Sequence, residues 1–206
     1  MSSTSPHGSV ADGFRDAMAG LASGVCVVTT AAGGEPAGLT TTAVMSVSLD
    51  PPLVAVGVAR SSRTLAPLRE ARRFAVHVLP HDREEVATVF ASKASDKFDG
   101  RAVRPGLGGV PVLTEDARHV LECETWAELE AGDHILLVGQ VLRVHSAEAD
   151  QGRALVHFDR EFHQVGAARA PSAHPPATNH PRETNHPRET NHPPATNHPP
   201  ATKGTM

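Results

Sequence analysis

Hydroxyl side chains gather on both sides of one apolar segment, and their spacing gives the first indication of chemistry. Five of them precede the uncharged segment 53–59: Thr40, Thr41, Thr42, Ser46 and Ser48. The run 61–64, Ser-Ser-Arg-Thr, follows it directly. A ligand with a flat, hydrogen-bonding head and a phosphate tail fits this pattern, because Arg63 and a helix start at 61–64 could bind the phosphate. Sheet threonines followed by an ordinary helix cap explain the same residues without a ligand.

Several other catalytic signatures are absent from the sequence. No GxGxxG or GxxxxGK[ST] run follows a strand pattern, and there is neither a GxSxG elbow nor an HExxH pair. His77 and His81 are separated by Pro80, so they do not share a helical face as zinc ligands. Cys26 and Cys123 stand in apolar runs that are typical of buried thiols. The sequence therefore disfavours hydrolase, zinc-enzyme and phosphate-loop chemistry.

Length and charge predict one folded domain and make nucleic acid an unexpected partner. The chain has 206 residues and a formal charge of −4, so it lacks the basic excess needed for nucleic acid. No apolar run approaches the roughly 20 residues of a spanning helix, and residues 1–12 do not resemble a secretory signal. We therefore expect a soluble, cytoplasmic protein without a nucleic-acid or membrane partner.

The C-terminal segment differs in composition from the rest of the chain. Residues 171–206 contain no Val, Leu, Ile, Phe or Trp, and carry a hexapeptide repeat in which proline follows each of five histidines. Such a segment cannot bury a core, and an extended polyproline-like tail is expected. Its histidines could form a weak metal-binding or partner-binding stripe, or the repeat could simply be solvated. We expect a flexible N-terminus at 1–12, one domain at 13–168 and a disordered tail at 169–206.

Hydrophobic periodicity predicts many short strands with helices between them. Helical spacing is found over 14–21, 61–73 and 82–92. Strands are expected over 25–30, 38–48, 53–59, 74–79, 119–130, 134–145 and 155–162, with the first two forming a hairpin and Pro51-Pro52 interrupting the ladder. Glu122, Glu124 and Glu128 alternate along one of these strands, which indicates a solvated face. This pattern favours a mainly β fold, an antiparallel barrel with short helical insertions, over a doubly wound α/β sheet.

A set of short sequence blocks carries a family resemblance. The blocks are Phe14-Arg15, 24–30 (GVCVVTT), 38–40 (GLT), 46–53 (SVSLDPPL), 74–79 (FAVHVL), 96–98 (DKF) and 132–134 (GDH). In order and spacing they resemble the flavin reductase family with the FMN-binding split-barrel fold, and the resemblance covers about 14–166 but not the tail. It implies a Greek-key-like split antiparallel barrel and a homodimer in which the partner subunit completes the flavin pocket. It also implies reduction of FMN or FAD by NADH or NADPH, with reduced flavin passing to a partner monooxygenase.

The resemblance also implies which residues would bind the flavin and the nucleotide. For the isoalloxazine and ribityl groups these are Pro36, Ala37, Gly38, Leu39, Thr40, Thr42 and Ala43, with Gly57, Val58 and Ala59 on the other side. Arg63 and Thr64 would meet the phosphate, and Phe90 would lie near the flavin unless it is simply a core residue. His134 would be the catalytic residue beside the nicotinamide, unless it only opens a strand, and His157, Phe158, Asp159 and Arg160 would cover the nicotinamide.

Four positions depart from the family pattern. Family members often have serine at the position of Ala43 and phenylalanine at that of Val44, so looser flavin binding is expected here. His157 and Arg160 replace a tyrosine and a glycine, which weakens the expectation of a nicotinamide contact at that segment.

The implied reaction needs little catalytic machinery from the protein. Hydride passes from nicotinamide C4 to flavin N5, so the protein must stack the two rings and stabilise the reduced flavin. Two functions fit this requirement. The first is an NAD(P)H:flavin oxidoreductase that releases reduced flavin, and the second is a flavin-binding carrier, sensor or oxidase subunit that does not turn over pyridine nucleotide.

Overall fold

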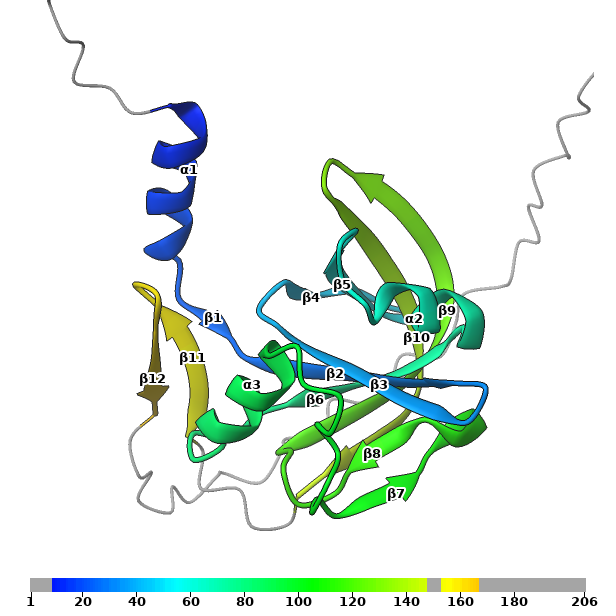
Figure 1. Ribbon diagram of the computed structural model, residues 1–206. Coiled ribbons are helices and arrows are strands. Elements are labelled where there is room, and N and C mark those ends of the chain that lie inside the picture. The colour runs from blue at the N-terminus through cyan, green and yellow to red at the C-terminus, as the bar shows by residue number, and fades with distance from the viewer. Residues whose placement is uncertain (1–8, 148–152, 167–206) are drawn as a thin grey trace, which may run out of the picture. The chain divides into compact units, whose positions relative to one another are not determined.

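A computed structural model describes residues 9–147 and 153–166, and the expected tail lies outside these residues. The described chain is mainly β with short helices (Figure 1). The helices are α1 (Val10–Ala19), α2 (Leu65–Ala71), α3 (Glu84–Ala91) and a short 3-10 helix (Leu107–Gly109). The strands are β1 (Ser23–Gly24), β2 (Cys26–Ala32), β3 (Glu35–Thr41), β4 (Val44–Leu49), β5 (Pro52–Ala59), β6 (Arg73–Val78), β7 (Val103–Pro105), β8 (Pro111–Leu113), β9 (His119–Ala131), β10 (His134–Ser146), β11 (Ala154–Phe158) and β12 (Glu161–Val165).

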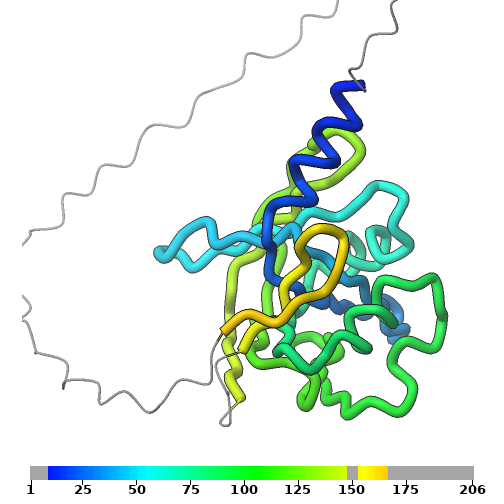
Figure 2. Tube along the Cα trace, turned by 90° about the vertical axis from the view of Figure 1, so that its left-hand side faces the viewer, coloured from blue at the N-terminus to red at the C-terminus, as the bar shows by residue number. Residues whose placement is uncertain are grey.

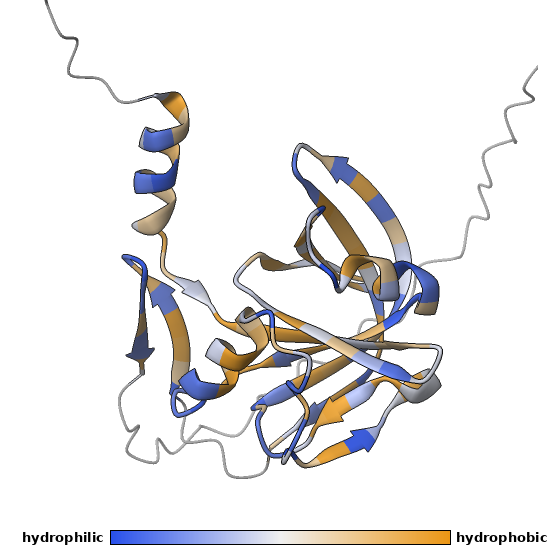
Figure 3. Ribbon diagram, viewed as in Figure 1, coloured by the Kyte–Doolittle hydropathy of each residue, from blue (hydrophilic) through white to orange (hydrophobic). Residues whose placement is uncertain are grey.

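A seven-stranded antiparallel sheet forms the centre of the fold, in the order β3-β2-β6-β9-β10-β5-β4. Hydrophobic and hydrophilic residues alternate along much of β9, as Figure 3 shows. The expectation of a mainly β, antiparallel fold is therefore confirmed. Within the described residues β3 and β4 form the two edges of this sheet, and closure into a split barrel remains a prediction.

The core lies on both faces of the sheet because neighbouring β2 side chains point in opposite directions. Val28 belongs to a buried cluster that includes Leu68 of α2 and Phe74 of β6. Val27 belongs to a second cluster, with Phe90 of α3. The two helices therefore cover opposite faces of β2, and the segment before α2 and the segment after α3 both reach Gly38 in the middle of β3.

The expected hairpin near the N-terminus is present, but its second arm is shorter than the sequence suggested. Strands β2 and β3 pair through the Gly33-Gly34 turn, where both glycines have positive φ. The expectation that this arm continues to residue 48 is wrong, because β4 pairs with β5 at the other edge of the sheet. The Thr41 hydroxyl accepts the Ala43 N–H at 3.1 Å and donates to the Gly57 carbonyl at 3.3 Å. These bonds turn the chain away from β2 and toward β5.

Other elements differ from expectation mainly at their ends. Helix α1 begins before residue 14 because Ser9 and Asp12 form a capping box, so it takes in part of the segment 1–12. The expected single strand 155–162 is a hairpin, because Asp159 and Arg160 both adopt positive φ between β11 and β12. This hairpin pairs with β1 and lies beside the C-terminal end of α1 (Figure 2). The expected helix 61–73 is the shorter α2, and Pro51-Pro52 leads into a β4–β5 hairpin.

Glu122 does not belong to a solvated face, unlike its neighbour Glu124. Its side chain is 1% exposed and accepts the Leu107 N–H at 2.6 Å, while His145 Nε2 lies 2.6 Å from Oε1. Burial alone would raise the pKa of Glu122, but the Leu107 and His145 hydrogen bonds and nearby Arg143 shift the pKa below its usual value. The sequence alternation concealed this residue because the β7–β8 segment covers its part of the strand.

Among the described residues, no helix combines the length and the hydropathy needed to span a membrane. Both cysteines are buried, as expected. Burial raises the pKa of each thiol to about 12, which leaves no reactive thiolate at neutral pH.

Candidate functional site

A pocket of about 430 Å³ lies where the end of β5, the middle of β3 and the segment after α3 meet. Its volume falls in the range of small-molecule sites. Its lining residues are Pro36, Ala37, Gly38, Leu39, Thr40, Ala59, Ser61, Ser62, Arg63, Thr64, Phe90, Ala91, Ser92, Lys93, Ala94, Ser95, Lys97, Phe98 and His134. The pocket therefore joins residues up to 98 positions apart in the chain.

Close packing between β3 and α3 forms the inner wall of the pocket. A Cβ added at Gly38 would lie 2.7 Å from Cε1 of Phe90, so only glycine allows the ring this position. The Thr40 hydroxyl donates to the Ala87 carbonyl at 2.7 Å, which fixes β3 against the helix. The Thr64 hydroxyl donates to the Gly38 carbonyl at 3.2 Å. Both hydroxyls thus hold backbone segments in place instead of pointing freely into the pocket.

The segment after α3 closes the pocket on its other side. Lys97 donates from Nζ to the Gly38 carbonyl at 3.0 Å and to the Phe90 carbonyl at 2.9 Å. The Phe98 ring meets the Phe90 ring edge to face, with centroids 5.1 Å apart and an interplanar angle of 88°. Desolvation by burial, followed by the charge of Arg63, lowers the pKa of Lys97. Both cations line the pocket.

The pocket is cationic and suits an anionic ligand group. Arg63, Lys93 and Lys97 line it, and no Asp or Glu is among its lining residues in the described chain. None of the ion pairs found between described residues involves these three cations. A phosphate would supply the missing negative charge. The expected helix start contributes less than predicted, because α2 begins only at Leu65 and has no side-chain cap.

His134 stands at the mouth of the pocket as the first residue of β10, directly opposite Ala59 of β5. Its side chain is 48% exposed, and Nδ1 lies 2.8 Å from Oδ1 of Asp133. That hydrogen bond holds the pKa of Asp133 below its usual value. Arg60 steadies the preceding turn, donating from Nε to the Gly132 carbonyl at 2.9 Å. With Nδ1 bonded to Asp133, Nε2 is the ring nitrogen available to a ligand.

Most of the residues that the resemblance assigned to the flavin lie together in this pocket. The residues brought together are Pro36, Ala37, Gly38, Leu39, Thr40, Ala59, Arg63, Thr64, Phe90 and His134. Thr42 and Ala43 are exposed on the link to β4 and do not line the pocket. Gly57 packs against Ala43, and the Val58 side chain is buried in the core.

The expected nicotinamide segment lies away from the pocket in this chain. His157, Phe158, Asp159 and Arg160 form the tip of the β11–β12 hairpin. This tip is tied to α1, because the Asp159 N–H donates to the Ala19 carbonyl at 2.7 Å and Arg160 pairs with Asp16 at 2.5 Å. None of these four residues is among the residues that line the pocket.

Sequence reasoning did not assign the segment after α3 to the site. Lys93, Lys97 and Phe98 line the pocket, and the Asp-Lys-Phe block at 96–98 was the available signal for two of them. Ser61 and Ser62 also line it, and they belong to the hydroxyl run noted beside Arg63. Lys93 had no signal of its own, because a single lysine after a helix is usually a solvated surface residue.

Comparison with known proteins identifies the chain's relatives. Residues 18–166 match the model of the flavin reductase like domain. The chain is 41% identical over 152 residues to an NADH:riboflavin 5'-phosphate oxidoreductase of Streptomyces pristinaespiralis, covering 73% of this chain and 85% of the relative. It is 39% identical over 163 residues to the actinorhodin polyketide dimerase of Streptomyces coelicolor, covering 78% and 90% of the two chains.

A solved structure supports the same relationship. BorF, the flavin reductase component of a bacterial two-component tryptophan halogenase, superposes with a TM-score of 0.69 at 31% identity. The superposition covers 76% of this chain and 99% of BorF. Because the family model spans most of the chain and contains every residue of the pocket, the protein belongs to the flavin reductase family.

Proposed function

We propose that the protein is an NAD(P)H:flavin oxidoreductase that reduces FMN or FAD in the pocket described above. The observation that carries this proposal is that three cations, Arg63, Lys93 and Lys97, line the same pocket as the half-exposed His134. We assign the cations to the flavin phosphate and His134 to the second, nucleotide substrate.

The pocket residues fit a flavin in charge and in shape. Arg63, Lys93 and Lys97 can accept a phosphate because no Asp or Glu is among the described lining residues. Apolar lining residues such as Ala37, Leu39 and Ala59 suit the ring system of the flavin. When bound, flavin and NAD(P)H supply the hydride chemistry themselves. The protein's task is to hold the rings in contact and to exclude water.

His134 is the residue that we assign to the nicotinamide side. Asp133 accepts from Nδ1 and so orients the imidazole, which leaves Nε2 to contact the nucleotide. Arg60 contributes indirectly, because its bonds to the Gly132 carbonyl and to Glu130 at 3.1 Å steady the β9–β10 turn. The histidine thus has a defined direction before any nucleotide binds.

We further propose that the sheet curls into a split barrel and that the functional unit is a homodimer. The Thr41–Gly57 hydrogen bond joins β3, at one edge of the sheet, to β5, next to the other edge. Helix α1 has no buried residue, with Val10 92% exposed and Phe14 64% exposed, and Leu49 of β4 is 89% exposed. Such apolar surface favours burial against a second copy. The partner's β11–β12 hairpin would then supply the nicotinamide cover that this chain's own hairpin does not reach.

Sedimentation tests the dimer. We expect a single dimeric species, and Leu49→Glu should shift it toward monomer and lower turnover. A monomeric wild-type protein with full reductase activity would contradict the dimer while leaving the reductase proposal intact.

We propose that the reduced flavin is released and used by a separate monooxygenase. The relationship to the reductase component of a two-component halogenase supports this role. The half-exposed His134 at the mouth of the pocket also supports it, because an open site permits exchange of flavin. We expect the cations of the pocket to select flavins that carry a phosphate while still allowing the reduced flavin to dissociate.

Absorbance at 340 nm distinguishes the reductase from a flavin-binding carrier, sensor or oxidase subunit. Purified protein is mixed with NADH or NADPH and with catalytic or excess FMN or FAD. A reductase consumes nucleotide at a rate that saturates with added flavin. A retained yellow cofactor that neither nucleotide reduces would refute the reductase and support the alternative.

A further inference from the structure

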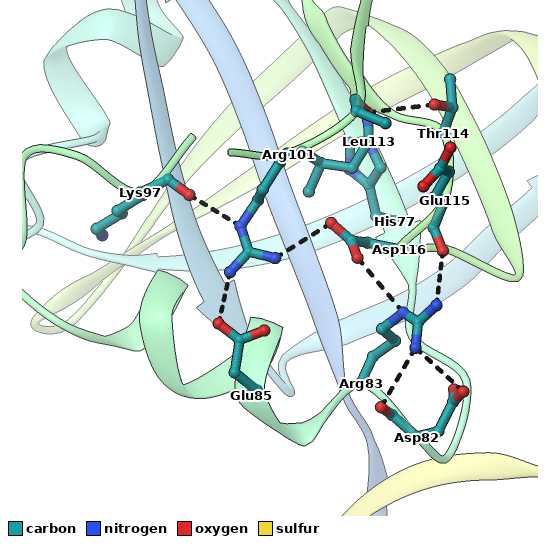
Figure 4. A network of polar contacts seen from close by, with 11 residues as sticks. His77, Asp82, Arg83, Glu85, Lys97, Arg101, Leu113, Thr114, Glu115 and Asp116 are labelled. Carbon is teal, nitrogen blue, oxygen red and sulfur yellow. Dashed lines mark hydrogen bonds and ion pairs between the residues drawn. The ribbon is translucent and has the colours of Figure 1, made fainter. Parts of the chain in front are cut away.

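Arg101 lies behind the pocket and connects three separate parts of the chain. It is outside the pocket lining, and its side chain is only 12% exposed. Its guanidinium pairs with Glu85 of α3 at 2.8 Å and with Asp116, in the β8–β9 connection, at 3.2 Å (Figure 4). Its Nε also donates to the Lys97 carbonyl at 3.0 Å. All of its nitrogen atoms therefore have partners in a planar, fork-like arrangement.

Arg101 contacts two residues of the pocket wall, Lys97 and Phe90. Lys97, whose carbonyl Arg101 holds, sends its ammonium group to the Gly38 and Phe90 carbonyls. The guanidinium carbon also lies 5.7 Å from the centroid of the Phe90 ring. Arg101 thus contacts the backbone of one pocket residue and the ring of another without entering the pocket itself.

We infer that Arg101 is a positioning residue for the flavin phosphate, acting through Lys97. This inference rests on the proposed flavin-reducing function. Segment 92–98 has no helix or strand of its own, so its position depends on side-chain contacts such as those of Arg101. Arg101 holds the Lys97 carbonyl while the Gly38 and Phe90 carbonyls hold its ammonium group, and Lys97 lines the same pocket as Arg63.

Arg83 offers a matched control within the same network. It also pairs with Asp116, at 3.4 Å, and it donates to the Glu115 carbonyl at 3.1 Å (Figure 4). Its hydrogen bonds and ion pairs go to Asp82, Glu115 and Asp116, outside segment 92–98, and it does not line the pocket. If FMN binding weakens because the polar network as a whole is disturbed, Arg83 variants should show the same loss. If it weakens because Lys97 is displaced, Arg83 variants should bind FMN normally.

The test compares binding of FMN with binding of riboflavin, which lacks the phosphate. Arg101→Lys keeps the charge but loses the fork that holds three partners. We expect its Kd for FMN, measured by fluorescence quenching on the full chain, to rise about tenfold, equivalent to one charge-assisted hydrogen bond. Its Kd for riboflavin should stay within about twofold of wild type on the same scale, and kcat at saturating FMN should change little. Arg83→Lys should preserve both affinities.

A second pair of variants keeps the test independent of the folding of Arg101→Lys. Glu85→Gln removes one partner from the exposed surface, where its side chain is 72% exposed, and Glu84→Gln removes an equal charge one residue away. Only Glu85→Gln should raise the Kd for FMN, by about two- to threefold, and it should leave the Kd for riboflavin unchanged. If Arg101→Lys does not fold, this pair decides the question.

The possible outcomes separate the positioning role from the proposed function. A wild-type protein that binds riboflavin as tightly as FMN would refute the phosphate site and, with it, the role of Arg101. A wild-type preference for FMN that Arg101→Lys and Glu85→Gln both retain would overturn the role of Arg101 alone. An equal loss in Arg83→Lys would also overturn it. In a Lys97→Met background, Arg101→Lys should cause no further loss of FMN affinity.

Discussion

Replacing Gly38 with alanine should damage stability and flavin binding together. The new Cβ would lie 2.7 Å from Cε1 and 2.8 Å from Cδ1 of Phe90, and 3.2 Å from the Val28 carbonyl oxygen. Ordinary carbon–carbon contacts are about 3.5 to 4.0 Å, so the ring must move by nearly 1 Å. Phe90 is 1% exposed and has Phe98 against its ring, so it has little room to do so.

The size of the effect follows from this overpacking. Inserting a methyl group into a filled site costs about 1 to 3 kcal/mol of unfolding free energy. A loss of about 2 kcal/mol lowers the melting temperature of a domain of this size by roughly 4 to 8 °C. Since Lys97 bonds to the Gly38 carbonyl, the same shift should displace its ammonium group. We expect about tenfold weaker FMN binding, equivalent to roughly 1.4 kcal/mol.

Two other glycines provide controls for this prediction. A Cβ at Gly139 would overlap the ring of buried Phe74, far from the pocket lining, so Gly139→Ala should lower the melting temperature but spare FMN affinity. A Cβ at Gly24 meets no atom within 4 Å, so Gly24→Ala should change neither quantity. Thermal unfolding and fluorescence titration measure the two effects separately. Unchanged stability and affinity in Gly38→Ala, or an equal loss of FMN affinity in Gly139→Ala, would refute the reasoning.

Three further predictions concern pH, the site and the tail. Burial lowers the pKa of His77 to about 4, so its unfolded form takes up a proton more readily than its folded form. The free energy of unfolding should be highest above pH 6.5 and fall by up to about 3 kcal/mol as the pH drops toward 4. Denaturation at several pH values should show a weaker pH dependence for His77→Gln. His134→Ala should lower kcat/KM for NADH about ten- to a hundredfold and spare FMN affinity, whereas Arg63→Ala should do the reverse in the same assays. Deletion after Ala170 should change unfolding free energy by less than about 1 kcal/mol and leave flavin reduction unchanged, which calorimetry and turnover measure.

Much of the fold followed from local patterns in the sequence. The apolar runs at 25–30, 53–59 and 74–79 all became strands of one antiparallel sheet, since buried strands need continuous apolar side chains. Their pairing partners were harder to foresee. Segment 44–49 has a strand-like pattern that suits either edge of the sheet, and the Thr41 hydrogen bonds decide which edge it joins.

Buried polar residues were the main failure of sequence reasoning. Glu122 resembles a surface residue because it alternates with apolar neighbours, yet the β7–β8 segment folds over it. For His77 the sequence indicated only that it does not share a helical face with His81 as a zinc ligand, and it did not predict burial. In the structure it is fully buried, with Nδ1 3.2 Å from the Val27 carbonyl oxygen and Nε2 accepting the Leu113 N–H at 3.1 Å. Both roles depend on distant segments, which periodicity cannot reveal.

The candidate site was predictable where the resemblance quoted its residues and unpredictable where tertiary contacts define it. The block at 38–40 and the histidine of the Gly-Asp-His block lie in the pocket. Lys97 belongs to a quoted block, but its role depends on bonds to the Gly38 and Phe90 carbonyls. Phe90 shows that a core interpretation and a site interpretation need not exclude each other, because this buried ring also lines the pocket.

The hydroxyl pattern marked the part of the chain that forms the pocket, but two of its threonines have a structural role. The hydroxyls of Thr40 and Thr64 donate to the carbonyls of Ala87 and Gly38. They therefore bind β3 to α3 and to the start of α2. A site built in this way tolerates Thr→Ser, which keeps the bond, better than Thr→Val, which keeps the shape but leaves a carbonyl without its donor.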